Sequence, residues 1–197
     1  MNAKITHIID QIKQLEIELE TLISTQQKNL NYRFDGAKIK IEASLLKQQL
    51  ALKVGIIPWL KMSRLRSLLS IPFIYGMAPP LVLLHLSIEI YQVICFKLYN
   101  IPRVKRADYF VADRHQLPYL NIIEKFNCAY CTYGNAVIAY TAEIIARTEL
   151  YWCPIKHARK KLGEHRHYHK FIAFGEHDQF HEKAKALRAQ MSKGQDI

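Results

Sequence analysis

The sequence predicts a mainly α-helical protein with a membrane-associated segment, and three observations support this prediction. Apolar residues recur at helical spacing in several stretches. One stretch of 22 residues, 67–88, contains no charged side chain, and 14 of its residues are apolar. Further along, cysteines and a histidine recur at the spacing of a metal site. Only residues 108–114 have the aromatic and β-branched composition of a strand, so we expect at most a short strand.

Length and charge limit the possible functions. The chain has 197 residues, which suits one domain with appendages or two small domains, and its formal net charge is +11. The basic residues gather at 61–66, 97–106 and 156–170, as expected for a protein that binds an anionic membrane surface or nucleic acid. The alternative for each cluster alone is a solvated surface. The amino-terminal stretch lacks the features of a secretory signal, so we expect the cysteines in a reducing compartment.

Residues 1–54 form the first predicted part, an amphipathic helical hairpin or coiled coil. Residues 3–27 are expected to form one helix with a heptad pattern. The two seam positions are held by Ile5, Ile12 and Leu19, and by Ile8, Leu15 and Leu22. This seam could join two copies as a parallel coiled coil, which would make the protein a homo-oligomer. We favour the alternative, in which residues 37–54 form a second helix that packs back after a turn at 31–36.

Residues 55–98 form the second predicted part, which combines an interfacial helix with the apolar stretch. The interfacial helix is short and basic and carries Trp59. Within the apolar stretch, the Pro79-Pro80 pair would break or kink a helix, and basic residues flank both ends. These features favour a re-entrant hairpin or a monotopic helix over a single membrane span. A buried core helix at 67–96 is the remaining alternative.

His85 and Glu89 interrupt the apolar stretch four residues apart, so they share one helical face. Ionisable residues in an apolar segment are costly and often functional, which suggests an acid–base or metal-ligand pair. The favoured interpretation is a polar stripe that faces the protein side of the helix.

Residues 99–163 contain the predicted metal site, formed by Cys128, Cys131, Cys153 and His157. The pairs Cys-x2-Cys and Cys-x3-His are typical of a four-ligand site, and three thiolates with one imidazole suit zinc. The same ligands suit iron or an iron–sulfur cluster. A helix of fifteen residues between the pairs would be about 22 Å long, so closing the site requires that helix to end early or bend back. Buried free cysteines are the alternative.

Four further polar residues are candidates for catalysis: Asp113, His115, Glu124 and Glu143. Carboxylate and imidazole groups in one cleft could bind iron. The sequence contains no Gly-rich phosphate loop, no nucleophile elbow and no His-Glu-x-x-His motif, so it does not support a hydrolase, kinase or dinucleotide enzyme. Whether the protein is an enzyme is left open. Residues 164–197 are rich in histidine and are expected to form a solvated, basic tail.

Several strings in residues 90–160 resemble a family of uncharacterised bacterial membrane-associated proteins. They are Asp108–His115, Tyr119–Asn121, Glu124–Cys131 and Arg147–Ala158. The resemblance implies a bacterial source and no particular activity. We therefore expect a protein on the cytoplasmic face of a bacterial inner membrane, or in the cytoplasm if residues 67–96 form a soluble core.

The function that we expect from the sequence is non-catalytic. A zinc-stabilised Cys/His module would bind a partner or an anionic lipid surface through its basic flanks. The first alternative is a redox enzyme that uses iron or an iron–sulfur cluster on the same ligands. The second alternative is a basic zinc module that binds nucleic acid, and the apolar stretch argues against it.

Overall fold

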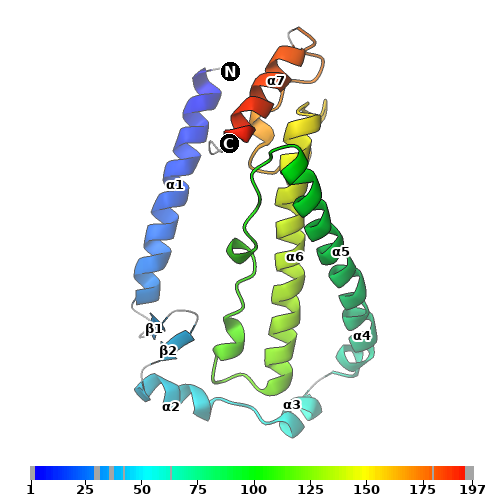
Figure 1. Ribbon diagram of the computed structural model, residues 1–197. Coiled ribbons are helices and arrows are strands. Elements are labelled where there is room, and N and C mark those ends of the chain that lie inside the picture. The colour runs from blue at the N-terminus through cyan, green and yellow to red at the C-terminus, as the bar shows by residue number, and fades with distance from the viewer. Residues whose placement is uncertain are drawn as a thin grey trace. The chain divides into compact units, whose positions relative to one another are not determined.

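The computed structural model describes residues 3–28, 32–35, 38–41, 43–62, 64–178 and 180–193 (Figure 1). The described chain is mainly helical, which confirms the predicted fold class. It divides into two compact units. The first unit contains Met1–Met62 and Asp113–Phe126, and the second contains Ser63–Ala112 and Asn127–Ile197.

The first unit contains one long helix, several short ones and a β-hairpin. Its elements are α1 (Ala3–Lys28), β1 (Tyr32–Asp35), β2 (Lys38–Ile41), α2 (Ala43–Ala51), α3 (Ile56–Met62) and the 3-10 turn η3 (Arg114–Gln116). The strands β1 and β2 pair antiparallel, with Tyr32 opposite Ile41. The predicted helix over residues 37–54 is therefore wrong in its first part. Polar and apolar residues alternate with a period of two in both strands, and this alternation favours a strand over a helix.

The heptad seam of α1 is not covered by the described residues. Five of its side chains are more than half exposed, namely Ile8, Ile12, Leu15, Leu19 and Leu22. The predicted helical hairpin, in which a second helix packs on this seam, is thus wrong for the described chain. The coiled coil between two copies stays a prediction.

The second unit begins with the long apolar helix. It consists of α4 (Leu65–Gly76), α5 (Ala78–Tyr91) and the π-helical turn η1 (Gln92–Phe96). The amide of Met77 donates to the carbonyl of Ile74 at 3.3 Å, and the amide of Leu81 donates to the carbonyl of Met77 at 3.2 Å, so the helix continues through this junction. Together these elements form one helix of 32 residues, which is long and apolar enough to cross a membrane.

The re-entrant hairpin predicted at Pro79-Pro80 is therefore wrong. The two prolines stand at the second and third positions of α5. Amides in the first turn of a helix have no partner within that helix, so a proline there loses nothing. The proline pair stands in the first turn of α5, at its junction with α4, and does not make a hairpin turn.

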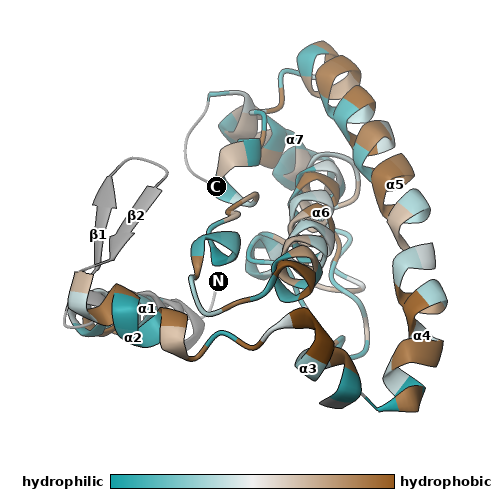
Figure 2. Cartoon of the chain, turned by 90° about the horizontal axis from the view of Figure 1, so that it is seen from below, coloured by the Kyte–Doolittle hydropathy of each residue, from teal (hydrophilic) through white to brown (hydrophobic). Residues whose placement is uncertain are grey.

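The helix α6 (Ile122–Trp152) is the longest single element of the described chain. It passes through Gly134-Asn135 without interruption, although a Gly-Asn pair is a common turn signal in a sequence. Within the second unit it lies beside α5 (Figures 1 and 2). Tyr91 of α5 shares a hydrogen bond of 3.0 Å with Thr148, and Tyr75 of α4 donates to Asn127. Earlier residues of the apolar helix thus contact the first part of α6, and later residues contact its last part. The two helices therefore run parallel.

Residues 101–112 return along this helix pair and pack into it. They contain only the 3-10 turn η2 (Arg106–Asp108), so the short strand predicted at 108–114 is wrong. Phe110 stacks on His85 of α5 with 4.9 Å between ring centroids. The returning segment thus covers polar side chains of the apolar helix.

Residues 153–193 complete the second unit with the 3-10 turn η4 (Tyr168–Lys170) and α7 (Phe180–Ser192). Ile155 and Ile172 form a parallel bridge. Tyr168, Phe171 and Met191 are buried in one core with α5 and α6. The prediction that residues 164–197 form a solvated tail is therefore wrong for these side chains. The buried core residues are Ile88, Phe96, Ile101, Val104, Tyr140, Ile144, Leu150, Tyr168, Phe171 and Met191.

Candidate functional site

A row of polar side chains lies between α5 and α6. His85 Nδ1 lies 3.0 Å from the hydroxyl oxygen of Tyr133. Tyr140 donates to Glu89 Oε1 at 3.1 Å, and Gln92 Nε2 donates to the Tyr140 hydroxyl oxygen at 2.6 Å. The positions 85, 89 and 92 follow helical spacing, so their side chains share the face of α5 that packs on α6. This confirms the interpretation of His85 and Glu89 as a polar stripe on the protein side.

His85 and Glu89 do not form a close pair with each other. His85 Nε2 lies 3.9 Å from Glu89 Oε1, which is too long for a hydrogen bond. The ring of His85 is instead enclosed by aromatic rings, with Phe110 stacked on it and Tyr133 at 5.7 Å. The Arg106 guanidinium lies 4.8 Å from the centroid of Phe110. A charged group is therefore stacked over the middle of the apolar helix.

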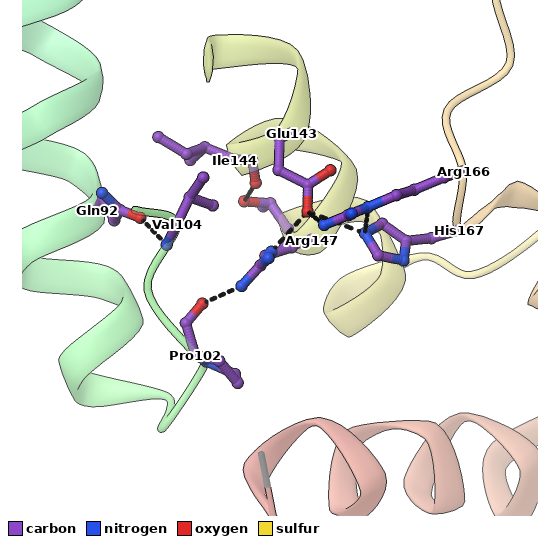
Figure 3. Close-up of polar contacts among 9 residues, drawn as sticks. Gln92, Pro102, Val104, Glu143, Ile144, Arg147, Arg166 and His167 are labelled. Atoms are coloured by element: carbon purple, nitrogen blue, oxygen red, sulfur yellow. Dashed lines mark hydrogen bonds and ion pairs between the residues drawn. The ribbon is translucent and has the colours of Figure 1, made fainter. Parts of the chain in front are cut away.

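Gln92 is a member of this polar row that the sequence prediction missed. Its side chain is fully buried, and its Oε1 accepts the amide of Val104 at 2.6 Å (Figure 3). The same side chain donates to Tyr140, so both ends of the amide are bonded. One feature of the sequence indicates this position: Gln92 continues the spacing of His85 and Glu89 along one helical face.

A cluster of hydrogen bonds in the second unit is centred on the Glu143 carboxylate (Figure 3). Its Oε1 accepts hydrogen bonds from Arg147 Nε at 2.8 Å, Arg166 Nη2 at 2.6 Å and His167 Nε2 at 3.1 Å. Arg147 also donates through Nη1 to the carbonyl oxygen of Pro102 at 2.7 Å. One carboxylate thus joins α6 to the returning segment and to the chain that precedes η4.

The pKa of Glu143 reflects these contacts. Burial alone would raise it, but hydrogen bonds from His167, Arg166 and Arg147 outweigh burial and hold the pKa at about 2, against an ordinary value of 4.5. The carboxylate is therefore ionised at neutral pH and already bonded to three donors. This state suits an anchoring role better than proton transfer, which works best with a pKa near the operating pH.

Glu124 has a structural role at the start of α6 in the first unit. The Asn121 amide donates to Glu124 Oε2 at 2.9 Å, and the Glu124 amide donates to Asn121 Oδ1 at 3.0 Å. These reciprocal bonds form a capping box, with Asn121 in place of the usual Ser or Thr. Trp59 Nε1 donates to the other oxygen, Glu124 Oε1, at 3.1 Å. The sequence predicted Glu124 as a catalytic candidate and missed its partner Asn121.

The catalytic candidates occupy separate positions. Asp113 precedes the 3-10 turn η3 and His115 lies within it; the Asp113 carbonyl accepts the Gln116 amide at 2.9 Å, and the His115 side chain is exposed. Glu124 and Glu143 are 19 residues apart on α6, which corresponds to about 28 Å along a helix. These two carboxylates therefore do not share a site.

The four predicted metal ligands are not brought together in the described chain. Cys128 and Cys131 lie in the second turn and third turn of α6, whereas Cys153 follows its last residue. Because α6 is uninterrupted, Cys131 and Cys153 are 22 positions apart along it, which corresponds to about 33 Å. His157 stacks on Tyr168, and its amide donates to the Tyr168 hydroxyl oxygen at 2.6 Å.

Among the described residues, no group of three or more His, Cys, Asp or Glu side chains is placed to hold a metal ion. Zinc, iron and iron–sulfur binding therefore stay predictions. All four cysteines are free thiols, and Cys131 and Cys153 are exposed.

Comparisons with protein-family models, with curated proteins and with solved structures found no match to this chain. The resemblance noted in the sequence therefore stays a prediction. Three features of the chain bear on its function: the exposed apolar helix, the buried polar row behind it and the Glu143 carboxylate with its three donors.

Proposed function

We propose that the protein binds an anionic membrane surface as a monotopic protein, with α4 and α5 lying in the plane of the interface. The support comes from the outer face of this helix. Eight large apolar side chains of the helix are more than half exposed: Leu65, Leu69, Phe73, Met77, Leu83, Leu86, Ile90 and Ile94. Figure 2 shows hydrophobic residues along both elements. Soluble proteins rarely expose an apolar patch of this extent unless it is a binding surface.

The exposure of this helix argues against the interpretation as a soluble core. A core helix would be mostly buried, but none of its most apolar stretch is buried by the described chain. Basic side chains stand at both ends: Arg64 precedes the helix, Arg66 lies in its first turn and Lys97 follows its last residue, and all three are exposed. Each basic residue near an anionic lipid surface contributes about 1 kcal/mol of attraction.

The position of Arg106 favours a helix in the plane over a helix that crosses. A helix of 32 residues is about 48 Å long, whereas the hydrocarbon core is about 30 Å thick. A crossing centred on the helix would place His85 in the hydrocarbon, together with Phe110 stacked on it and the Arg106 guanidinium above. An arginine at the bilayer centre costs about 3 kcal/mol or more.

The returning segment adds a second cost to a crossing. Residues 101–112 are largely non-helical, and backbone of this kind is tolerated at membrane depth only where protein covers it. Arg103 and Lys105 in this segment are exposed. A helix in the plane avoids both costs, because its apolar face contacts lipid while α6 and the returning segment pack on its other side.

A charge on the apolar face tests the membrane contact. Leu83→Glu should lower binding of the full chain to phosphatidylcholine vesicles containing phosphatidylglycerol by at least about tenfold, because a leucine contact with lipid worth about 1.5 kcal/mol or more is replaced by a charge that anionic lipid repels. Leu162→Glu is the matched control, since Leu162 is 87% exposed but lies outside the helix. Equal binding of the two variants in a sedimentation assay would contradict the proposal.

Labelling of the two helix ends distinguishes a helix in the plane from a span. Single cysteines at Ser67 and Lys97, in a chain whose four native cysteines are serine, are treated with an impermeant maleimide in sealed vesicles. A monotopic protein should react at both sites from the outside. A site that reacts only after detergent is added would show a span and overturn the monotopic arrangement. Thermal unfolding of the serine chain beside the native chain shows whether the background is folded.

A further inference from the structure

A second uncharged face lies on α6, opposite the side chains that α6 buries in the core. The side chains of Ala136, Val137, Tyr140 and Ile144 face the core and are buried. With 100° between successive residues, the opposite face carries a seam made of Cys128, Cys131, Asn135, Ile138, Ala142 and Ile145. Ile138 and Ile145 are each more than half exposed, and none of the six is charged.

The seam has the spacing of a two-helix contact. Its six positions alternate intervals of three and four residues, which is the heptad of parallel paired helices. Asn135 takes a seam position at which a single asparagine fixes register and oligomeric state in such pairs. The Asn135 side chain donates to the Cys131 carbonyl at 2.9 Å, and this hydrogen bond fixes the orientation of the asparagine on the seam.

The first two seam positions provide half of a metal site. Cys128 and Cys131 are one turn apart on the same face, separated by about 4.5 Å along the axis. Two thiolates are too few for a structural zinc ion, which takes four ligands at about 2.3 Å from sulfur. Cys153 and His157 cannot supply the rest within one straight chain, because the whole of α6 lies between the pairs.

We infer that two copies of the chain pair in parallel along this seam and share one zinc ion, held by Cys128 and Cys131 of both copies. A symmetric parallel pair places each seam residue at the level of its counterpart, so the four thiolates meet at one end. The seam is uncharged from Cys128 to Ile145, so pairing brings no like charges together. A second copy is therefore the partner that this face fits, and it completes a ligand set that one chain leaves incomplete.

This inference is independent of the membrane proposal. The seam residues of α6 are different from the exposed apolar residues of α4 and α5 that are proposed to contact lipid, so substitutions can test each proposal separately. Failure of one proposal therefore leaves the other to be judged by its own experiment.

Metal content and mass of the purified full chain in detergent test the shared site. The chain, produced with zinc, should be a dimer with about one zinc ion for every two chains. Cys128→Ser and Cys131→Ser should each remove the zinc, whereas Cys153→Ser and His157→Ala should retain it. Cys95→Ser is a further control, since Cys95 lies in η1 and outside the seam.

A charge in the seam separates pairing from loss of a ligand. Ile138→Lys leaves all four cysteines in place and should still yield monomers that lack zinc, whereas Leu162→Lys should stay dimeric. Helical circular dichroism of each variant shows whether it is folded.

Cross-linking provides a measurement on chains with an intact seam. After zinc is removed by a chelator, oxidation with copper phenanthroline should join Cys153→Ser chains through their seam cysteines into a covalent dimer.

A monomeric wild-type chain overturns the inference. So does one zinc ion per chain that is lost in Cys153→Ser, because it would show that the ligands come from one chain.

Discussion

Glu143 shows how one side chain can join three segments of the second unit. Its three donors differ in burial: the His167 side chain is 4% exposed, Arg147 is 19% exposed and Arg166 is 63% exposed. Ion pairs in solvent contribute little to stability, whereas leaving a buried charge without its partner is costly. Most of the stabilisation should therefore come from the two buried donors and little from Arg166.

Substitutions at this carboxylate separate the contributions. Glu143→Gln removes the charge while keeping the shape, and should lower the free energy of unfolding by about 2–3 kcal/mol, since hydrogen bonds to charged groups are among the strong ones. Arg166→Ala should cost less than about 1 kcal/mol because its side chain is mostly in solvent. Denaturant unfolding of the full chain in detergent measures both. Equal losses in the two variants would contradict the ranking by burial.

At the scale of elements, the pairing of α5 with α6 depends on a close approach at Gly134. A Cβ built at this glycine would lie 3.3 Å from Leu81 Cδ1 of α5. Gly76 at the end of α4 is different, because a Cβ there meets nothing within 4 Å. Gly134 thus allows a close contact between two helices, whereas no packing contact requires a glycine at position 76.

This difference predicts opposite effects of substitution. Gly134→Leu should destabilise the helix pair by about 1–3 kcal/mol, because extra atoms are forced into a packed contact. Gly76→Ala should stabilise the protein by up to about 1 kcal/mol, the difference in helix propensity between the residues. Thermal midpoints of both variants beside the wild type check the signs. A neutral Gly134→Leu would show that α5 can move away from α6 without cost.

The elements that the sequence predicted well are those set by local pattern. The helix at 3–27 and the helical character of the apolar stretch follow from the spacing of apolar residues, and both were found. The errors came at residues whose effect depends on context. Pro79-Pro80 and Gly134-Asn135 are turn signals in isolation, but the prolines begin a helix and the glycine permits a helix contact. Position within the element decided both cases.

At the scale of the whole molecule, the polar contacts could not be predicted because their partners are remote in sequence. Glu143 was a candidate from its residue type, but its donors Arg166 and His167 come from a segment expected to be a solvated tail. Gln92 has a backbone amide, that of Val104, as one partner, and no sequence pattern indicates such a partner. The predicted metal ligands are not brought together in one chain. Their sequence spacing suits a metal site, but the unbroken helix α6 keeps the two ligand pairs apart.

The stability of the folded protein should depend on pH through two buried or half-buried groups, Glu143 and His165. Because the folded pKa of Glu143 is about 2, against 4.5 for an ordinary carboxyl, the folded state is stabilised above pH 4.5 and loses this contribution as the pH falls towards 2. The pKa of His165 is lowered by burial, partly opposed by its hydrogen bond with Glu149, so stability begins to fall already below its ordinary value of 6.5.

The loss of stability therefore begins below pH 6.5 for His165 and below pH 4.5 for Glu143, and a variant can identify the Glu143 contribution. The difference in thermal midpoint between the wild type and Glu143→Gln should be full at pH 7 and shrink as the pH falls from 4.5 towards 2, because the wild-type carboxylate is then protonated as well. Glu164→Gln removes an exposed carboxylate from the neighbouring segment and should follow the wild-type curve closely. Thermal scans at pH 7, 5, 4 and 3 provide the measurement. A difference that stays constant down to pH 3 would mean that Glu143 stabilises the fold through its shape and neutral hydrogen bonds, and that its charge contributes nothing to the joining of α6 with the segments around it.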